Sequence, residues 1–240
     1  DVDRSRGLGD VYKRQTNVAV DADIVLTFSE TVDTESGNIT IKKTSDDSTV
    51  ETIDVTSNKV TGNSRVLLIG GGSSGTVITI NPASDFDGST EYYVLIDSTA
   101  FDDSSSNSYA GISSTTALSF TTVDTANPTL STSTPADNAA NVAVSSNIIL
   151  NFDENVDVES GNIIIKRSSD DSIFETIAVT SDRVRGTGTS KIIIDPIKNF
   201  KVNTSYYLII AATAFDDTAG NSYAGISSKT ALNFLSLIHI

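Results

Sequence analysis

Acidic and amide side chains have the clearest capacity for chemistry in this chain. They stand at corresponding places in its two halves and in the short segment between them: Glu30, Asp33, Asp102, Asp103, Asp124, Glu154, Asp157, Asp216, Asp217 and Asn221. Their oxygens are hard ligands, and Ca²⁺ takes 6–8 of these, so the residues form a candidate calcium set. Their spacing matches no EF-hand loop. The alternative is that they are solvated turn residues, because Asp and Asn suit tight turns.

The composition excludes most other site chemistry. The chain has 240 residues, with 31 Asp+Glu against 16 Lys+Arg and no Cys, Met or Trp. The lack of Cys rules out disulfides, Cys-ligated zinc and thiol catalysis. A net charge of −15 disfavours a nucleic-acid partner, which needs a basic face. No apolar run approaches the ~20 residues of a membrane-spanning helix, so we expect no membrane insertion.

Two remaining patterns with cofactor or catalytic potential have simpler explanations. Residues 70–75, GGGSSG, satisfy the form GxGxxG, but residues 76–80 read as a strand where a dinucleotide site needs a helix. We therefore interpret them as a hairpin loop. Paired carboxylates can serve a glycosidase, yet the acidic residues occur in both halves alike, and tandem duplication of an active site is uncommon. We expect no enzyme here.

The two ends of the sequence read as translated sequencing adapter. The codons GAT GTG TAT AAG AGA CAG encode residues 10–15, and their reverse complement encodes residues 235–240. We therefore interpret residues 1–15 and 235–240 as artefact and exclude them from fold reasoning. The only histidine, His239, falls in this excluded part, which leaves no Ser–His–Asp arrangement. Residues 16–234 carry 12 basic and 28 acidic residues, a net charge of −16.

The rest of the sequence contains one module twice. Residues 17–20, NVAV, recur as residues 141–144 at an offset of 124, and residues 107–112, NSYAGI, recur as 221–226 at an offset of 114. The aligned blocks share 54 identities in 89 positions, and the first copy has ten extra residues around positions 63–75. This is typical of tandem arrays. We expect an N-terminally truncated module at 16–122, a linker at 123–128 and a C-terminally truncated module at 129–234.

Each copy reads as short strands separated by turn residues. In the second copy the strand-like stretches are residues 148–152, 162–166, 173–179, 191–194, 206–210 and 231–234, rich in β-branched or aromatic side chains. No stretch shows a sustained helical period, so we predict antiparallel β-sandwiches. Tyr92 and Tyr206, each six residues after a phenylalanine, fit the tyrosine corner, in which the hydroxyl bonds to nearby backbone at the start of strand F.

Four segments of the second copy carry a family resemblance: residues 135–139, PADNA; 148–157, IILNFDENVD; 206–210, YYLII; and 217–221, DTAGN. Together they resemble the bacterial Ig-like repeat of S-layer and other large surface proteins. The resemblance implies an all-β fold of two tandem Ig-like antiparallel β-sandwiches with Greek-key topology. It also implies a non-catalytic module that is extracellular or at the cell surface. One departure is DEN at 153–155, where the family commonly has Ser-Glu-Pro, which leaves the turn after strand B less rigid.

An Ig-like sandwich places its B–C and F–G loops at the same end. We assign Glu154 and Asp157 to the B–C loop. The F–G loop then holds Asp216, Asp217 and Asn221, and the first copy presents Glu30, Asp33, Asp102 and Asp103 in the same way. Asp124 and Asn127 of the linker enter at this end, so we expect them to complete a calcium site between the modules and to stiffen the array.

A structural role is the function that these features favour. We expect a spacer in a larger secreted or cell-surface bacterial protein of adhesin, S-layer or motility type, with neighbouring repeats as its partners. The alternative is an adhesion module that binds surface glycans or proteins. Of the aromatic side chains, only Tyr109 and Tyr223 are candidates for an exposed sugar platform, since the tyrosines of strand F are expected to pack inward. An accessory domain of an extracellular enzyme is less favoured.

Overall fold

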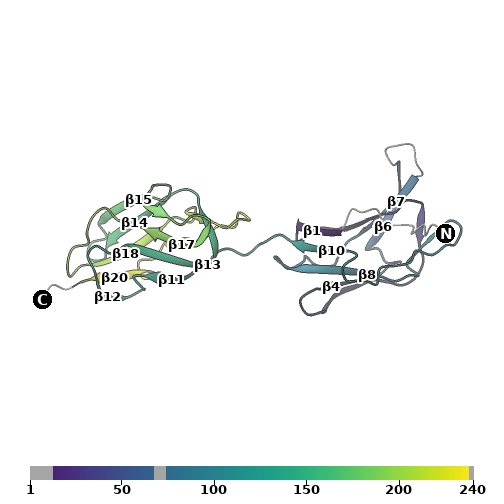
Figure 1. The fold of residues 1–240 in the computed structure, drawn as a ribbon, viewed down its shortest axis with the longest axis horizontal. Coiled ribbons are helices and arrows are strands. Elements are labelled where there is room, and N and C mark those ends of the chain that lie inside the picture. Colours follow the sequence, from purple (N-terminus) through teal and green to yellow (C-terminus); the bar gives the residue numbers. More distant parts are fainter. Residues whose placement is uncertain (1–12, 68–73, 238–240) are drawn as a thin grey trace. The chain divides into compact units, whose positions relative to one another are not determined.

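The computed structural model describes residues 13–67 and 74–237, and every regular element in this part of the chain is a strand (Figure 1). The chain divides into two compact units, Asp1–Asp124 and Thr125–Ile240, called here the first and second modules. Each unit has its own hydrophobic core. Residues 70–73 of the GxGxxG segment at 70–75 lie outside the described residues. Within the described part, no helix has the length and hydropathy that a bilayer span requires.

The second module is a sandwich of two sheets with the strand order of an immunoglobulin domain. One sheet has the order β11-β13-β17-β16, and the other has the order β12-β20-β18-β14-β15. Strands β13, β14, β18 and β20 therefore correspond to B, C, F and G. The strands are β11 Leu130–Thr134, β12 Ala139–Val142, β13 Ile148–Val158, β14 Asn162–Arg167, β15 Ile173–Ala178, β16 Val184–Arg185, β17 Thr189–Ile194, β18 Ser205–Ile210, β19 Phe215–Asp216 and β20 Asn233–Ser236.

The first module repeats this arrangement. Its sheets have the orders β1-β10-β8-β4-β5 and β2-β7-β6, and β3 pairs with β9. The counterpart of β11 would fall on residues 6–10, outside the described residues. The strands are β1 Lys13–Val18, β2 Ile24–Thr27, β3 Val32–Thr34, β4 Asn38–Lys43, β5 Thr49–Asp54, β6 Val60–Leu67, β7 Ser74–Ile80, β8 Glu91–Ile96, β9 Phe101–Asp103 and β10 Ser119–Thr122.

Period-two alternation explains why these segments form strands. Along β13, the side chains of Ile148, Leu150 and Phe152 are buried, and the intervening side chains are half-buried. They meet Ile163 and Leu208 of the facing sheet in a single cluster. Both inner faces are thus apolar, as a two-sheet sandwich requires. The expected all-β, Ig-like fold without disulfides is confirmed. The expected strand at 148–152 is longer than predicted, because β13 continues to Val158.

The tyrosine corner is confirmed in both modules. The Tyr206 hydroxyl accepts a hydrogen bond from the backbone N–H of Lys201 at 2.9 Å, and the Tyr92 hydroxyl accepts one from Asp87 at 2.9 Å. Both rings are almost completely buried. In the second module, Tyr206 lies against Phe200 with ring centroids 5.0 Å apart. The corner therefore fixes the backbone that leads into strand F to the hydrophobic core.

Strand β1 includes residues 13–15, which the sequence assigned to adapter-derived sequence. It pairs in parallel with β10, as β12 does with β20. Arg14 has a positive φ of 55°, and its counterpart Asn138 has 59°. Asn tolerates this left-handed conformation better than Arg does, so the site suits the residue of the second module. The adapter interpretation stays a prediction.

The ten extra residues of the first module lengthen one hairpin. Strands β6 and β7 pair from Val60 opposite Ile80 out to Leu67 opposite Ser74, whereas β16 has only two residues. Both hairpins contain a bulge glycine with positive φ. A Cβ on Gly62 would lie 2.1 Å from the Val77 carbonyl oxygen, and one on Gly186 would lie 2.0 Å from that of Lys191. Glycine is therefore required at these bulges.

The tyrosine corner yields a stability prediction. We expect Tyr206→Phe to lower the free energy of unfolding of the second module by about 1 kcal/mol, because the Lys201 N–H loses its acceptor. The melting temperature should fall by roughly 4–8 °C, measured by circular dichroism. Tyr223→Phe, a buried ring outside the corner, serves as the control. An equal loss in the control would contradict the specific role of the corner.

Candidate metal centre

The structure corrects the expected position of one acidic group. Glu154 and Asp157 lie within strand β13, not in a B–C loop. Glu154 has the same alternating register as buried Phe152 and Val156, and it is half-buried itself. The acidic composition suggested a turn, but a strand at the end of a sandwich can carry polar side chains on alternate positions. In the first module, which has Thr31 at the position of Asn155, the chain instead breaks between β2 and β3, and Glu30 lies in that break.

The expected approach of the B–C and F–G regions is confirmed by strand pairing. The end of β13 pairs with β19, which follows strand F, and Asp157 lies opposite Asp216. In the first module β3 pairs with β9 in the same way, and Asp33 lies opposite Asp102. Like charges directly opposite each other are destabilising. Oδ1 of Asp216 is also buried without a hydrogen-bond partner among the described residues, which is uncommon for such an atom.

Asp217 is held by the loop that it begins. Its Oδ1 accepts hydrogen bonds from the backbone N–H groups of Ala219 and Asn221, both at 2.8 Å, and its Oδ2 accepts one from the Asn221 side chain at 2.8 Å. Burial by itself would raise the pKa of Asp217, but these hydrogen bonds outweigh burial and hold the pKa below its ordinary value. Asn221 is therefore an orienting residue for this carboxylate.

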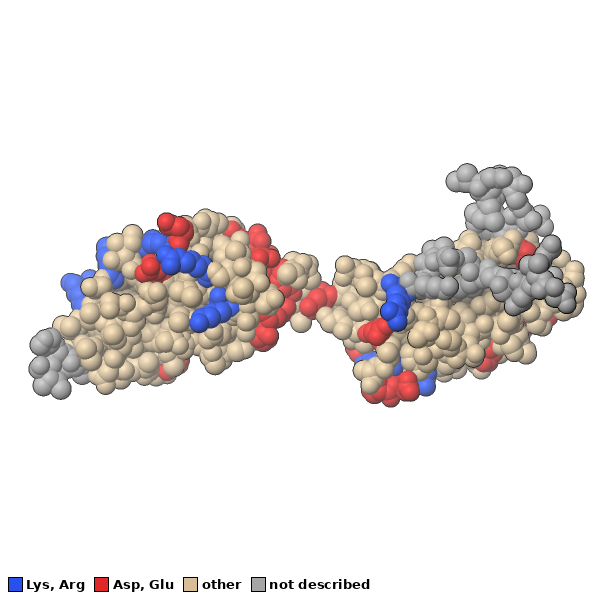
Figure 2. Space-filling model, in the orientation of Figure 1, with Lys and Arg blue, Asp and Glu red and all other residues tan. Residues whose placement is uncertain are grey.

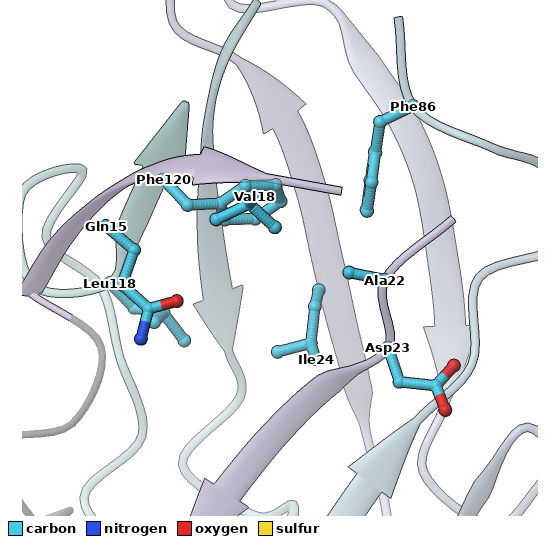
Figure 3. A pocket seen from close by; sticks show the side chains of 8 residues that line it. All are labelled: Gln15, Val18, Ala22, Asp23, Ile24, Phe86, Leu118 and Phe120. Atoms are coloured by element: carbon cyan, nitrogen blue, oxygen red, sulfur yellow. The ribbon is translucent and has the colours of Figure 1, made fainter. Parts of the chain in front are cut away.

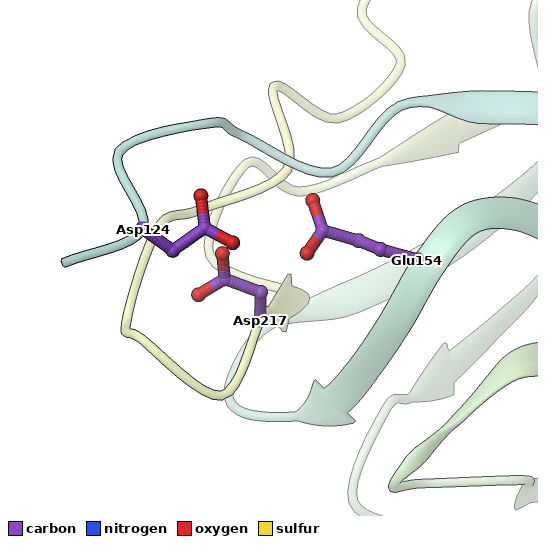
Figure 4. A group of neighbouring side chains, drawn as sticks. All are labelled: Asp124, Glu154 and Asp217. Carbon is purple, nitrogen blue, oxygen red and sulfur yellow. The ribbon is translucent and has the colours of Figure 1, made fainter. Parts of the chain in front are cut away.

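Three carboxylates come together beside the β13–β19 pair (Figure 4). Asp124, Glu154 and Asp217 each place one carboxylate oxygen within 4.8 Å of the other two. Oxygens that bind a single Ca²⁺ at 2.3–2.6 Å lie at most about 5 Å apart, so this spacing fits a shared cation. Asp217 is 5% exposed, and the other two are half-buried. Acidic side chains also gather at this end in the space-filling view (Figure 2).

The remaining members of the predicted set are not in this group. Asp157 and Asp216 form the cross-strand pair, and Asp157 accepts a hydrogen bond from the Thr187 hydroxyl at 3.1 Å. In the first module, Asp103 repeats the loop geometry of Asp217, with hydrogen bonds from Ser105 and Asn107. Glu30 corresponds to Glu154. The offset of 124 leaves no counterpart of Asp124 in the sequence, and the described residues form no three-carboxylate group there.

The expectation of exposed aromatic side chains is wrong. Tyr223 is 6% exposed and packs edge-to-face on Phe152, with ring centroids 5.1 Å apart. Tyr109 is half-buried and packs in the same way on Phe28 at 5.3 Å. Burial raises the pKa of both hydroxyl groups. These rings belong to the cores, so they offer no platform for a sugar.

A small apolar cavity in the first module is too narrow for a ligand (Figure 3). Its lining includes Val18, Ile24, Phe86 and Leu118, and its volume is about 20 Å³. A single water molecule needs about 10–15 Å³. The cavity therefore holds roughly one water at most.

A comparison with protein families identifies the family to which the chain belongs. The model of the bacterial Ig-like domain matches residues 11–122 and again residues 124–235. The chain belongs to the bacterial Ig-like domain family. The resemblance found in the sequence is thus confirmed for both copies. All three grouped carboxylates, including Asp124, fall within the second match. A comparison with curated proteins gave no match.

Bacterial Ig-like domains typically are non-catalytic and commonly occur in extracellular or surface proteins. The geometry of the acidic group agrees with a ligand or a turn role, since its carboxylate oxygens lie close together and Asp217 accepts hydrogen bonds from two loop amides. The loop geometry of Asp217 was not predicted. Its signal was the Asp-x-x-x-Asn spacing, which occurs at Asp103–Asn107 and again at Asp217–Asn221.

The lowered pKa of Asp217 yields a pH prediction. Its ionised form is stabilised in the fold, so the contribution is fully present above the ordinary pKa of about 3.9 and is lost as the pH falls below it. We expect Asp217→Ala to lower the free energy of unfolding by about 1–3 kcal/mol at pH 7, because two loop amides lose their acceptor. Urea unfolding between pH 7 and pH 3 measures both effects. If the variant lost stability with falling pH as steeply as the wild type, Asp217 would not be the titrating group.

Proposed function

We propose that the chain is a spacer segment of a larger secreted or cell-surface bacterial protein of adhesin, S-layer or motility type. The observation that supports this is the tandem match of the family to both halves of the chain. Each module is closed by its own core and needs no partner to bury its apolar faces. Modules of this kind can be added in series, and each addition extends the chain by one folded unit.

As a spacer, the chain would have to resist a pulling force along its length. A pulling force reaches the second module through its terminal strands β11 and β20, which are joined by backbone pairing to β13 and β12, respectively. Several hydrogen bonds must then break together before the sandwich opens. The alternating buried faces resist the same opening, since separation of the sheets exposes both inner faces to water.

Small-angle X-ray scattering on residues 16–234 tests the spacer proposal. We expect an elongated particle, because two modules in series separate their centres of mass. The control is the second module alone, residues 125–234. A radius of gyration close to that of a single compact globule of the full length would contradict the proposal.

A second candidate function is calcium-dependent stiffening of the tandem array. The group of Asp124, Glu154 and Asp217 favours it. Hard oxygen ligands at this spacing fit Ca²⁺, and the cation would relieve the mutual repulsion of three carboxylates. Asp217 would supply a ligand from the F–G loop and Glu154 one from strand β13. Asp124 would supply a third from the segment that precedes β11. Asn221 would keep the Asp217 carboxylate oriented.

Thermal unfolding tests the calcium proposal. Free Ca²⁺ at 100-fold above its dissociation constant should stabilise the folded form by about 2.7 kcal/mol, a rise of roughly 4–8 °C, relative to chelator. Glu154→Gln should remove the rise, whereas the matched variant Glu30→Gln in the first module should keep it. An equal rise with Mg²⁺, or an unchanged midpoint, would leave the acidic group as solvated turn residues.

The glycan-binding alternative depended on exposed rings at Tyr109 and Tyr223. Both rings pack in the cores, so this support is removed. Protein contacts remain compatible with the fold. The two modules differ in charge beside the tyrosine corner, where Asp21, Asp23 and Asp85 of the first correspond to uncharged residues of the second.

A further inference from the structure

The first module has an acidic hollow beside its tyrosine corner. The hollow lies between residues 20–23, which precede β2, and residues 81–85, which follow β7, and its volume is about 160 Å³. This is about ten times the ~15 Å³ that admits one water molecule. Its lining is mostly polar and includes three exposed aspartates: Asp21, Asp23 and Asp85. Its lining also includes the small, exposed side chains of Ala83 and Ser84.

The second module has the opposite chemistry at the same backbone positions. Ser145, Asn147 and Asn199 replace the three aspartates. Ile197 and Lys198 replace Ala83 and Ser84, and both are exposed, with 75% of Ile197 accessible to water. The backbone is otherwise shared, because the Phe86 N–H bonds to the Val20 carbonyl at 2.8 Å and the Phe200 N–H bonds to the Val144 carbonyl at 2.8 Å. The matching loop of the second module thus carries an exposed isoleucine and lysine, and Ile197–Lys198 is called the tip here.

The tip of the second module is held rigidly. Glu175, which is 8% exposed, accepts hydrogen bonds from the backbone N–H of Ile197 at 3.2 Å and of Lys198 at 3.4 Å. Arg183 forms an ion pair with the same carboxylate. The first module uses the same clasp, in which Glu51 accepts a hydrogen bond from the Ala83 N–H at 2.8 Å. A large exposed isoleucine on a fixed loop loses little conformational entropy on binding.

We propose that the Ile197–Lys198 tip of one chain docks into the acidic hollow of the first module of a second copy of this chain. Charge complementarity supports this occupant, since Lys198 would meet Asp21, Asp23 and Asp85. Ile197 would lie over the small side chains of Ala83 and Ser84. The overall charge of −15 does not prevent the contact. At physiological ionic strength the Debye length is about 8 Å, so mainly the local charges act.

The contact is heterologous, because two different surfaces meet. Each chain carries one tip and one hollow, so chains can join in closed pairs or in longer series. Neighbouring charges follow the same trend. Lys201 in the second module stands where the first has Asp87, and Asp87 lies 2.6 Å from Lys43. Lys201 and Val202 are both exposed and extend the cationic, apolar surface beyond the tip.

Sedimentation equilibrium of the 240-residue chain in chelator tests the proposal. We expect the average mass to rise above 25.3 kDa with protein concentration and to fall back with added salt. Ile197→Ala with Lys198→Ser removes the tip, and Asp21→Ser, Asp23→Asn and Asp85→Asn together remove the hollow's charge. Each variant should weaken self-association at least about tenfold, or 1.4 kcal/mol. Both should fold, because the sister module already carries these residues at the same positions.

A mixture of the two variants tests directly whether the tip pairs with the hollow. The variant without the tip keeps its hollow, and the variant without the charged hollow keeps its tip. An equimolar mixture should therefore form heterodimers at concentrations at which each variant alone is mostly monomeric. Lys191→Ser, an exposed lysine of β17 away from the tip, should associate as the wild type does. A wild-type chain that stays monomeric up to about 1 mM, or association that survives both variants, would overturn the proposal. So would a mixture that remains monomeric.

Discussion

Each sandwich depends on one buried tyrosine at the entry to strand F. The Tyr206 ring has no exposed surface, and it lies against Phe174, Phe200 and Phe234 of three other segments. Its hydroxyl is the only part of the side chain that needs a polar partner, and the backbone of Lys201 supplies it. A single side chain thus joins the β17–β18 connection to strands β15 and β20 of its own sheet.

The tyrosine corner also fixes the backbone of the segment next to it. Because the backbone path is fixed at Phe86 and Phe200, exchanges on the neighbouring residues alter the surface without altering the fold. Val50 in the first module stands where Phe174 packs on the corner of the second, and 43% of Val50 is exposed. The duplication therefore works as a natural substitution series. Shared residues identify what the fold needs, and the differences identify where the two surfaces have diverged.

The sequence was sufficient for the fold because period-two alternation and turn residues reflect local physics. It was also sufficient for the tyrosine corner, whose spacing is fixed by the length of one turn. Glu154 and Asp157 were expected in a loop but lie in a strand. Acidic residues suit turns and the exposed positions of strands alike, so their composition could not distinguish the two. Tyr223 was misjudged, since its polar neighbours in sequence gave no sign of Phe152 in space. The hollow was not predictable, because it depends on segments 60 residues apart that only the fold brings together.

The long β6–β7 hairpin has a consequence for protein engineering. The first module carries ten residues more than the second in this hairpin, yet both keep the bulge glycine and the same buried positions on β7 and β17. The connection between β16 and β17 is therefore an insertion-tolerant position of a scaffold without cysteines. A foreign peptide grafted after Gly186 would be displayed from a short, well-anchored stem, and its presentation would be independent of the redox state of the compartment.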